Sequence, residues 1–372
     1  MPAEIPVPLA VPDLGGREAE YLARCVADNW VSSAGPFVTE MERRMAALAG
    51  RAHAVATVNG TAALHLALVV AGVRPGDLVI VPDWTFAATA NAVFHAGAEP
   101  WFLDVAPQSW TLDPALVAEA LERAPRRVGA VVAVHALGHP ADMDPLAAVC
   151  ARAGVPVVED AAGAIGASYR DRPVGSLADI AIFSFNGNKT VTTGGGGMIV
   201  TGNETWATRA RSLSTQARAG ADYSHDAVAW NYRMPNINAA VGLAQLERLA
   251  EMVAAKRTIA ARYDEALADR DDLRPMPRMP WADSNCWMYA VACAGPEAAR
   301  SLVAHLRARA VEARPFWRSL SGQRPYSGAP TRLLGVSAGL SGRVVSLPCS
   351  SGLAPETQAR VIAALKAWRF AA

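Results

Sequence analysis

The chain has 372 residues, of which 52% are hydrophobic and 19% charged, enough apolar material for a large domain with a smaller one beside it. This composition excludes wholesale disorder, and a net charge of +1 gives no electrostatic case for nucleic acid or an anionic membrane as a partner. Five scattered cysteines without a CxxC pair disfavour a disulfide framework and a metal site, and no apolar run is long enough for a membrane span. We expect a cytoplasmic protein.

The first half of the chain alternates between two kinds of apolar pattern. Helical spacing covers 17–29 and 39–49, and the link between them, 29–38, is either a plain loop or a pocket wall that includes Ser33. β-Branched runs then alternate with helical stretches; the runs are 54–58, 78–81, 128–134 and 155–158, and the stretches are 61–72, 85–96, 114–124 and 142–153. This alternation predicts a mostly parallel sheet with helices on both faces and ligand sites at the carboxyl ends of the strands.

Polar or aromatic side chains follow three of these strands. Gly60 and Thr61 open a helix whose free N–H groups and dipole suit a phosphate, although Asn-Gly-Thr alone is more often a turn with an N-cap. Phe86 follows the second strand and either belongs to the core or stacks on a flat ligand ring. Asp160 ends a wholly apolar strand and either caps the next helix or needs a partner at a cavity edge.

A single lysine lies between two further apolar runs, 180–183 and 198–200. Lys189 is flanked by hydroxyls, amides and four glycines; a solvated loop lysine is the ordinary alternative, but burial here would favour the neutral amine of a Schiff-base lysine. A phosphate-type helix start, an aromatic ring, a buried acid and a lysine are the parts that pyridoxal 5′-phosphate (PLP) requires. Ser184 stands five residues before the lysine and could hold the phosphate with Thr61.

The remaining chain predicts a second, smaller domain. A helix over 204–213, an irregular stretch over 214–230 and a long amphipathic helix over about 236–269 lead to a Pro-rich turn at 275–281. A strand at 287–293 and helices at 297–310 and 355–368 follow. We therefore expect a large α/β domain over 1–245 and a small α+β domain over 246–372.

Eight segments in order resemble the DegT/DnrJ type of PLP-dependent nucleotide-sugar aminotransferase, most of all its LegC-like subgroup. They are NWVSSAGPFV (29–38), NGTAALHLAL (59–68), TFAATANAV (85–93), GHPADMDP (138–145), EDAA (159–162), FSFNGNKTVTTGGGGM (183–198), NYRMPNINAAVGLAQL (231–246) and LPCSSGL (347–353). The resemblance implies fold type I, with a mostly parallel sheet in a three-layer sandwich, and a homodimer with shared active sites.

The resemblance also assigns residue roles. Lys189 would form the Schiff base and then act as general base, Asp160 would pair with the pyridine nitrogen, and Phe86 would stack on the ring. The phosphate would be held by Gly60, Thr61, Ala62 and Ser184, and by Asn231 of the neighbouring subunit. The sugar nucleotide would contact Ser33, Asn186, Asn188, Arg314 and Trp317.

The implied reaction is amination at C4 of a nucleotide-linked 4-keto-6-deoxy sugar, with L-glutamate as donor and 2-oxoglutarate as co-product. The alternatives are an aminocyclitol or antibiotic-sugar ketone as acceptor, and a PLP-binding regulator without turnover. A sugar dehydratase of this family would carry histidine in place of Lys189.

Three positions depart from the family pattern. Gly163 stands where Gln or Glu is usual beside the phenolic oxygen of the cofactor, which leaves room for water or for a side chain from elsewhere. The segment 135–139 reads His-Ala-Leu-Gly-His and lacks an aromatic hydroxyl, and Ser321 replaces a frequent histidine. These departures bear on the substrate more than on the type of reaction.

Overall fold

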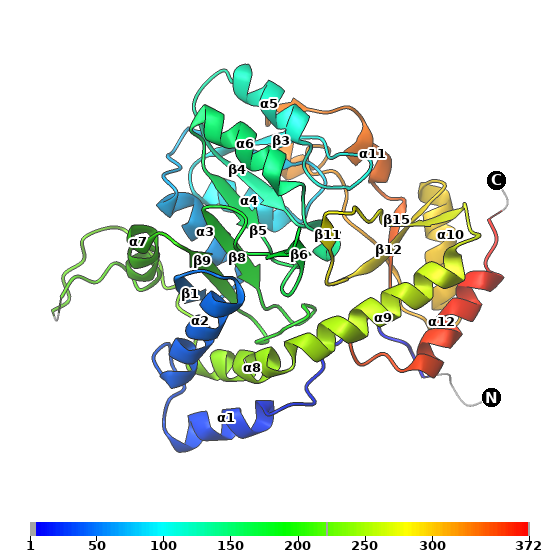
Figure 1. Cartoon of the computed structure of the whole chain (residues 1–372), viewed down its shortest axis with the longest axis horizontal. Coiled ribbons are helices and arrows are strands. Elements are labelled where there is room, and N and C mark those ends of the chain that lie inside the picture. The colour runs from blue at the N-terminus through cyan, green and yellow to red at the C-terminus, as the bar shows by residue number, and fades with distance from the viewer. Residues whose placement is uncertain (1–4, 221, 371–372) are drawn as a thin grey trace.

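A central eight-stranded sheet organises the computed structural model, which describes residues 5–220 and 222–370 (Figure 1). The strands, in spatial order, are β1 (His53–Thr57), β9 (Gly197–Thr201), β8 (Ile180–Ser184), β5 (Val157–Asp160), β4 (Val128–Val134), β2 (Leu78–Pro82), β3 (Glu99–Leu103) and β14 (Thr331–Arg332). Only β9 runs against its neighbours, so the predicted mostly parallel sheet is confirmed. The carboxyl ends of the other strands therefore share one edge.

Helices cover both faces of this sheet, because successive strand residues point to opposite sides. In β4, Val131 and Ala133 join one apolar core, whereas Val132 and Val134 join the other. The first core includes residues of α1 (Glu18–Ala27), α2 (Pro36–Leu48), α5 (Pro114–Glu122), α6 (Met143–Ala153) and α8 (Asn236–Glu247). The second includes residues of α3 (Gly60–Val70), α4 (Ala87–His95) and α7 (Glu204–Ser214). This is the three-layer sandwich that the resemblance implied.

Strand β3 was not predicted from the sequence, and it contains Pro100, a residue that is rare in the interior of a strand. Pro100 is tolerated here through the position of β3 near the edge of the sheet. The N–H of Phe102 points outward to Pro330 of the short neighbouring segment, so the nitrogen of Pro100, two residues earlier, lies on the same outer side. No ladder hydrogen bond to the inner strand β2 is lost.

The C-terminal part builds a separate four-stranded antiparallel sheet. Its strands are β10 (Leu273–Pro275), β12 (Tyr289–Cys293), β15 (Val344–Leu347) and β13 (Arg314–Pro315), and its helices are α9 (Leu249–Leu267), α10 (Pro296–Arg307), α11 (Val336–Leu340) and α12 (Pro355–Ala367). A three-stranded sheet of β11 (Ala282–Asp283), β6 (Ser168–Tyr169) and β7 (Arg172–Pro173) and the pairing of β14 with β3 join this part to the large sheet. The domain boundary at residue 245 stays a prediction.

The prediction of one continuous helix over about 236–269 is wrong in one respect. The structure divides it into α8 and α9 at Arg248, whose backbone leaves the helical region (φ −107°, ψ 7°). The guanidinium of Arg248 binds Asp13 at 2.8 Å and Glu251 at 2.7 Å. Amphipathic spacing continues on both sides of the break, so the periodicity does not reveal it.

Within the described residues, no helix has both the length and the hydropathy that crossing a bilayer requires.

Candidate active site

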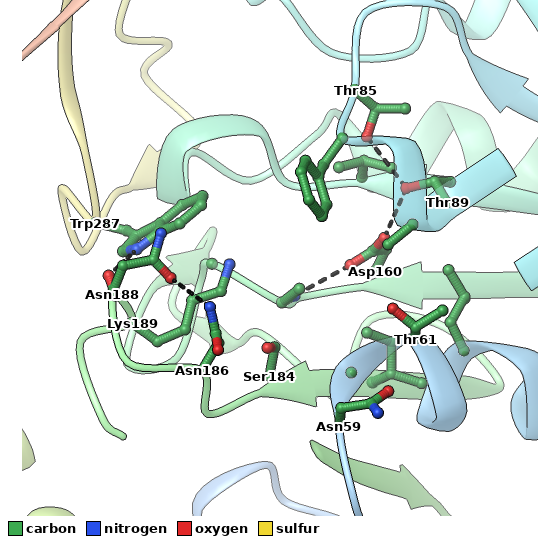
Figure 2. Close-up of a pocket in the computed structure, with 18 of the residues that line it drawn as sticks. Asn59, Thr61, Thr85, Thr89, Asp160, Ser184, Asn186, Asn188, Lys189 and Trp287 are labelled. Atoms are coloured by element: carbon green, nitrogen blue, oxygen red, sulfur yellow. Dashed lines mark hydrogen bonds between the residues drawn. The ribbon is translucent and has the colours of Figure 1, made fainter. Parts of the chain in front are cut away.

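A cavity of about 330 Å³ opens at the carboxyl edge of the large sheet. Strand ends, the start of α3 and the turn after β8 supply most of its wall, and residues near the start of β12 and after β13 supply the rest. Figure 2 shows Lys189 and Asp160 reaching into this cavity from two sides, with Thr61 and Ser184 near its floor. The predicted sheet edge and the observed cavity coincide.

Lys189 ends a tight turn that follows β8. Its N–H donates to the carbonyl oxygen of Asn186 at 2.9 Å, and the side-chain amides of Asn186 and Asn188 lie 3.3 Å apart in a hydrogen bond. Burial lowers the pKa of Lys189 to about 7, although the negative charge of Asp160 opposes this shift. The neutral fraction of this amine at pH 7 is therefore far larger than the roughly one in three thousand of an ordinary lysine. The side chain is a nucleophile near neutral pH.

Asp160 is a buried acid at the end of β5, and residues 161–167 form turns, so it does not cap a helix. Its Oδ2 accepts from the hydroxyl of Thr89 at 3.1 Å and its Oδ1 from the N–H of Ala162 at 3.2 Å. Burial raises the pKa of Asp160, against these two hydrogen bonds and the charge of Lys189. The carboxyl group thus has its orientation fixed while it faces the cavity.

Glu159, the neighbouring acid, points to the opposite face of the sheet and serves the fold. Its carboxylate accepts from the N–H groups of Gly175 at 2.6 Å and Leu177 at 3.1 Å. It also lies 2.9 Å from Nε2 of His135, whose Nδ1 accepts from the N–H of Ala141 at 3.1 Å. Because Nδ1 is an acceptor, Nε2 carries the proton and donates it to Glu159. His135 is also among the residues that line the cavity.

The start of α3 forms the floor of the cavity. The helix begins at Gly60, and the side chain of Asn59 accepts from the N–H of Ala62 at 2.8 Å. A Cβ at position 60 would lie 2.8 Å from Cβ of Ser184, so glycine allows the helix start to pack directly on the end of β8. Two hydroxyls, those of Thr61 and Ser184, and the positive end of a helix therefore meet at one place.

The structure brings together nine of the thirteen predicted site residues. The cavity is lined by Gly60, Thr61, Phe86, Asp160, Ser184, Asn186, Asn188, Lys189 and Trp317. Four others, Ala62, Asn231, Ser33 and Arg314, do not belong to the described lining, and their roles stay predictions. Asn231 and Arg314 are exposed on the isolated chain.

The cavity lining also includes residues that were not predicted from the sequence, among them Thr89, His135 and Trp287. Thr89 lies in the first turn of α4, and its hydroxyl is 3.2 Å from that of Thr85, which precedes the helix. His135 directly follows the buried strand β4, and Asp160 ends the neighbouring strand β5. Trp287 comes from the C-terminal part and carries no local signal of any kind.

The side chains present fit PLP. An amine with a near-neutral pKa can react with an aldehyde, and a buried acid across the cavity can pair with a ring nitrogen. Two hydroxyls at a helix N-terminus suit a phosphate. The ring of Phe86 lines the cavity yet is 60% exposed, as expected of a face that a flat ligand would cover.

Comparison with known proteins agrees with this geometry. GDP-perosamine synthase of Caulobacter vibrioides is 40% identical over 96% of this chain and 97% of its own. EpsN of Bacillus subtilis, assigned by its name to the pyridoxal phosphate-dependent aminotransferases, is 39% identical over 96% of this chain and 94% of its own. The crystal structure of DesI in the presence of its TDP-sugar product superposes with a TM-score of 0.89 at 33% identity, covering 98% of this chain and 93% of that one. The model of the DegT/DnrJ/EryC1/StrS aminotransferase family matches residues 12–366, and the chain belongs to that family.

Proposed function

We propose that this aminotransferase uses PLP to transfer the amino group of L-glutamate to C4 of a nucleotide-linked 4-keto-6-deoxy sugar. One observation carries the proposal: a lysine with a pKa of about 7 faces a buried acid across a cavity whose floor is a helix N-terminus. The names of two relatives, a GDP-perosamine synthase and DesI with its TDP-sugar product, support a sugar nucleotide as the acceptor.

Different residues would bind different parts of the cofactor. The hydroxyls of Thr61 and Ser184 and the N–H groups at the start of α3 would bind the phosphate. Asp160, oriented by Thr89, would hydrogen-bond the ring nitrogen. When bound, PLP supplies an electron-withdrawing ring that stabilises negative charge on the carbon next to the reacting nitrogen.

Lys189 moves the protons. Its neutral Nζ takes the proton from Cα of glutamate as that C–H bond breaks. In the second half of the reaction, the same Nζ delivers a proton to C4 of the sugar, where a new C–H bond forms. Because the lysine is poised near pH 7, it is competent both to accept and to donate.

The keto sugar occupies the cavity in this proposal, and the nucleotide lies outside it. Asn186, Asn188 and Trp317 line the cavity and would contact the sugar. None of the described lining residues is an arginine, so the diphosphate finds no guanidinium inside. Arg314 and Ser33, outside the cavity, remain candidates for the nucleotide.

A homodimer completes the proposal. The segment that includes residues 215–220 and 222–230 projects from the body of the chain near α7 (Figure 1). Within it, Val228 is 93% exposed and Tyr223 is 84% exposed, as apolar side chains at a subunit contact would be in an isolated chain. Asn231, which directly follows this segment, would then reach the phosphate site of the neighbouring subunit.

The test is a panel of acceptors with L-glutamate as donor, analysed by mass spectrometry. The acceptors are GDP-, UDP- and TDP-linked 4-keto-6-deoxy sugars, with an aminocyclitol ketone as an unrelated ketone. We expect a 4-amino sugar nucleotide and an equal amount of 2-oxoglutarate from at least one nucleotide sugar. Amination of the cyclitol ketone alone would overturn the acceptor class, and a visible absorption band indifferent to glutamate would overturn the transaminase mechanism.

A further inference from the structure

The missing side chain at Gly163 is replaced by a residue from the far end of the chain. A Cβ at position 163 would lie 2.2 Å from Cε3, 2.8 Å from Cζ3 and 2.9 Å from Cδ2 of Trp287. No side chain larger than hydrogen fits at position 163 while the indole keeps this place. Gly163 and Trp287 therefore form one unit of packing, 124 residues apart in sequence.

The indole of Trp287 also contacts the reacting lysine and the residue before it. Nζ of Lys189 lies 3.5 Å from the ring centroid, within the range in which a cation is attracted to an aromatic face. The indole N–H donates to the carbonyl oxygen of Asn188, the residue before the lysine, at 2.8 Å (Figure 2). The same ring thus holds both the side chain and the backbone of the lysine turn.

Four hydrogen bonds hold the backbone that carries the ring. The N–H of Trp287 donates to Oδ1 of Asn285 at 3.0 Å, and the amide of Asn285 donates to the carbonyl oxygens of Gly163 at 3.0 Å and Ile165 at 2.8 Å. The carbonyl oxygen of Trp287 accepts from the buried Nζ of Lys256 at 3.3 Å. The side chain of Asn285 therefore links the backbone of Gly163 to the backbone of Trp287.

We propose that Trp287 is a positioning residue for Lys189: its indole fills the space above Gly163, excludes water from the amine and pins the turn that carries the lysine. The inference rests on the proposed function in that Lys189 is the reacting amine. It deepens that function, because a residue from the C-terminal part of the chain then controls the position and the hydration of the Lys189 amine. It also identifies the side chain that takes the place left by glycine at position 163.

The chain offers a clean assay, because it has three lysines, at positions 189, 256 and 366. Full-length protein freed of PLP is labelled with trinitrobenzenesulfonate over a range of pH, and each lysine is quantified by peptide mass spectrometry. Lys366 is exposed and reports an ordinary amine, whereas Lys256 is buried and stays unlabelled as long as the protein is folded. The pH midpoint for Lys189 is expected near 7 in the parent protein.

Three variants, compared with the parent protein, test the proposal as a double-mutant cycle. In Trp287→Leu, water reaches the amine, and because desolvation is the main cause of its low pKa, this exposure raises the Lys189 midpoint. The lost attraction between the ammonium and the ring acts in the opposite direction by less than about one unit, and the net rise is about one unit or more. At pH 7 that rise lowers the labelling rate about fivefold. Gly163→Ala displaces the indole and raises the midpoint in the same direction. The double variant equals Trp287→Leu alone, since the added methyl group then meets no ring.

The matched control is Trp368→Leu, which removes a buried tryptophan that does not line the cavity; it lowers stability and leaves the Lys189 midpoint unchanged. If Trp287→Leu does not fold, so that Lys256 becomes labelled, Trp287→Phe takes its place. That variant keeps a ring, loses only the hydrogen bond to Asn188, and is expected to speed hydrogen exchange in residues 186–189 at least tenfold.

The proposal fails if the shift in Trp287→Leu matches that of Trp368→Leu, if the shifts of the two single variants add in the double variant, or if Trp287→Phe leaves exchange unchanged. Labelling needs neither donor nor acceptor, so the result is independent of the acceptor panel. Failure of that panel with a Trp287-dependent midpoint would reject the proposed function and keep the positioning role. Added PLP is expected to protect Lys189, but not Lys366, from labelling, and this result would connect the positioning role with the proposed function.

Discussion

Replacing Asp104 by asparagine is expected to destabilise the protein strongly. This carboxylate follows β3, is fully buried and accepts five hydrogen bonds from the chain. Its Oδ1 accepts from the N–H of Val105 at 2.9 Å and from the N–H and hydroxyl of Ser337 at 2.7 and 2.6 Å. Its Oδ2 accepts from the N–H groups of Leu334 at 2.7 Å and Val336 at 2.9 Å. Asp104 thereby pins α11 and the segment after β14 to the edge of the large sheet.

The magnitude follows from counting donors that lose their acceptor. Asparagine must place its NH₂ group where one carboxylate oxygen stood, and the less costly choice is Oδ2, which faces two donors rather than three. Two N–H groups, those of Leu334 and Val336, then lose a charged acceptor in partly buried hydrogen bonds. At about 1–3 kcal/mol each, the loss is about 2–6 kcal/mol. That is a large part of the roughly 5–15 kcal/mol typical of a folded domain.

The same carboxylate makes stability depend on pH. Burial alone raises the pKa of Asp104, but the hydrogen bonds from Ser337, Leu334 and Val336 outweigh it and hold the pKa below its ordinary value. A lowered pKa in the folded state contributes stability that is present above the unfolded pKa of about 3.9 and is lost as the pH falls through the folded pKa. The difference in the free energy of unfolding between the parent protein and the asparagine variant therefore becomes smaller below about pH 4.

The assay is urea unfolding followed by circular dichroism at several pH values. The exposed Asp269, changed to asparagine, serves as the control and should lie within about 0.5 kcal/mol of the parent. A free energy of unfolding for the Asp104 variant within about 0.5 kcal/mol of the parent, with an unchanged denaturant slope, would refute the reasoning.

Two further substitutions test the site itself. Lys189→Ala is expected to lower amino transfer by a factor of about a thousand or more, because both the nucleophile and the proton carrier are lost, while Lys366→Ala at the surface retains the parent rate. Steady-state rates of 2-oxoglutarate release check this, and substantial turnover by the alanine variant would sink the assignment. Asp160→Asn removes the charge that favours the Lys189 ammonium, so the labelling midpoint of Lys189 should fall below about 7. A midpoint that rises would show that Asp160 does not act on Lys189 as described.

The sequence predicts the sheet edge of the site well, and the physical reason is topological. Parallel strands place their carboxyl ends together, so the residues after successive apolar runs must meet whatever the details of packing. Asp160 and Ser184 end such runs, and Lys189 follows the second within a short turn; the structure brings all three to one cavity. Thr61 follows because a helix start must lie at the end of the strand before it.

Packing between distant segments could not be predicted in this way. Strand β14 has two residues, too few for any periodic signal, and joins the large sheet because Asp104 holds the segment behind it. The break at Arg248 lies within an uninterrupted amphipathic pattern. Both features depend on contacts across more than 200 residues, which spacing along the chain does not encode.

Gly163 shows both what the sequence can predict and what it cannot. From the sequence it is a vacancy beside the predicted cofactor, to be filled by water or by some other side chain. The chain contains ten tryptophans, and nothing local distinguishes Trp287 from the rest. What selects it is the pair of hydrogen bonds from Asn285 to the carbonyl oxygens of Gly163 and Ile165, which bring the start of β12 against the end of β5. Glycine at position 163 and tryptophan at position 287 therefore depend on each other, and a substitution at either position should change the pKa of Lys189.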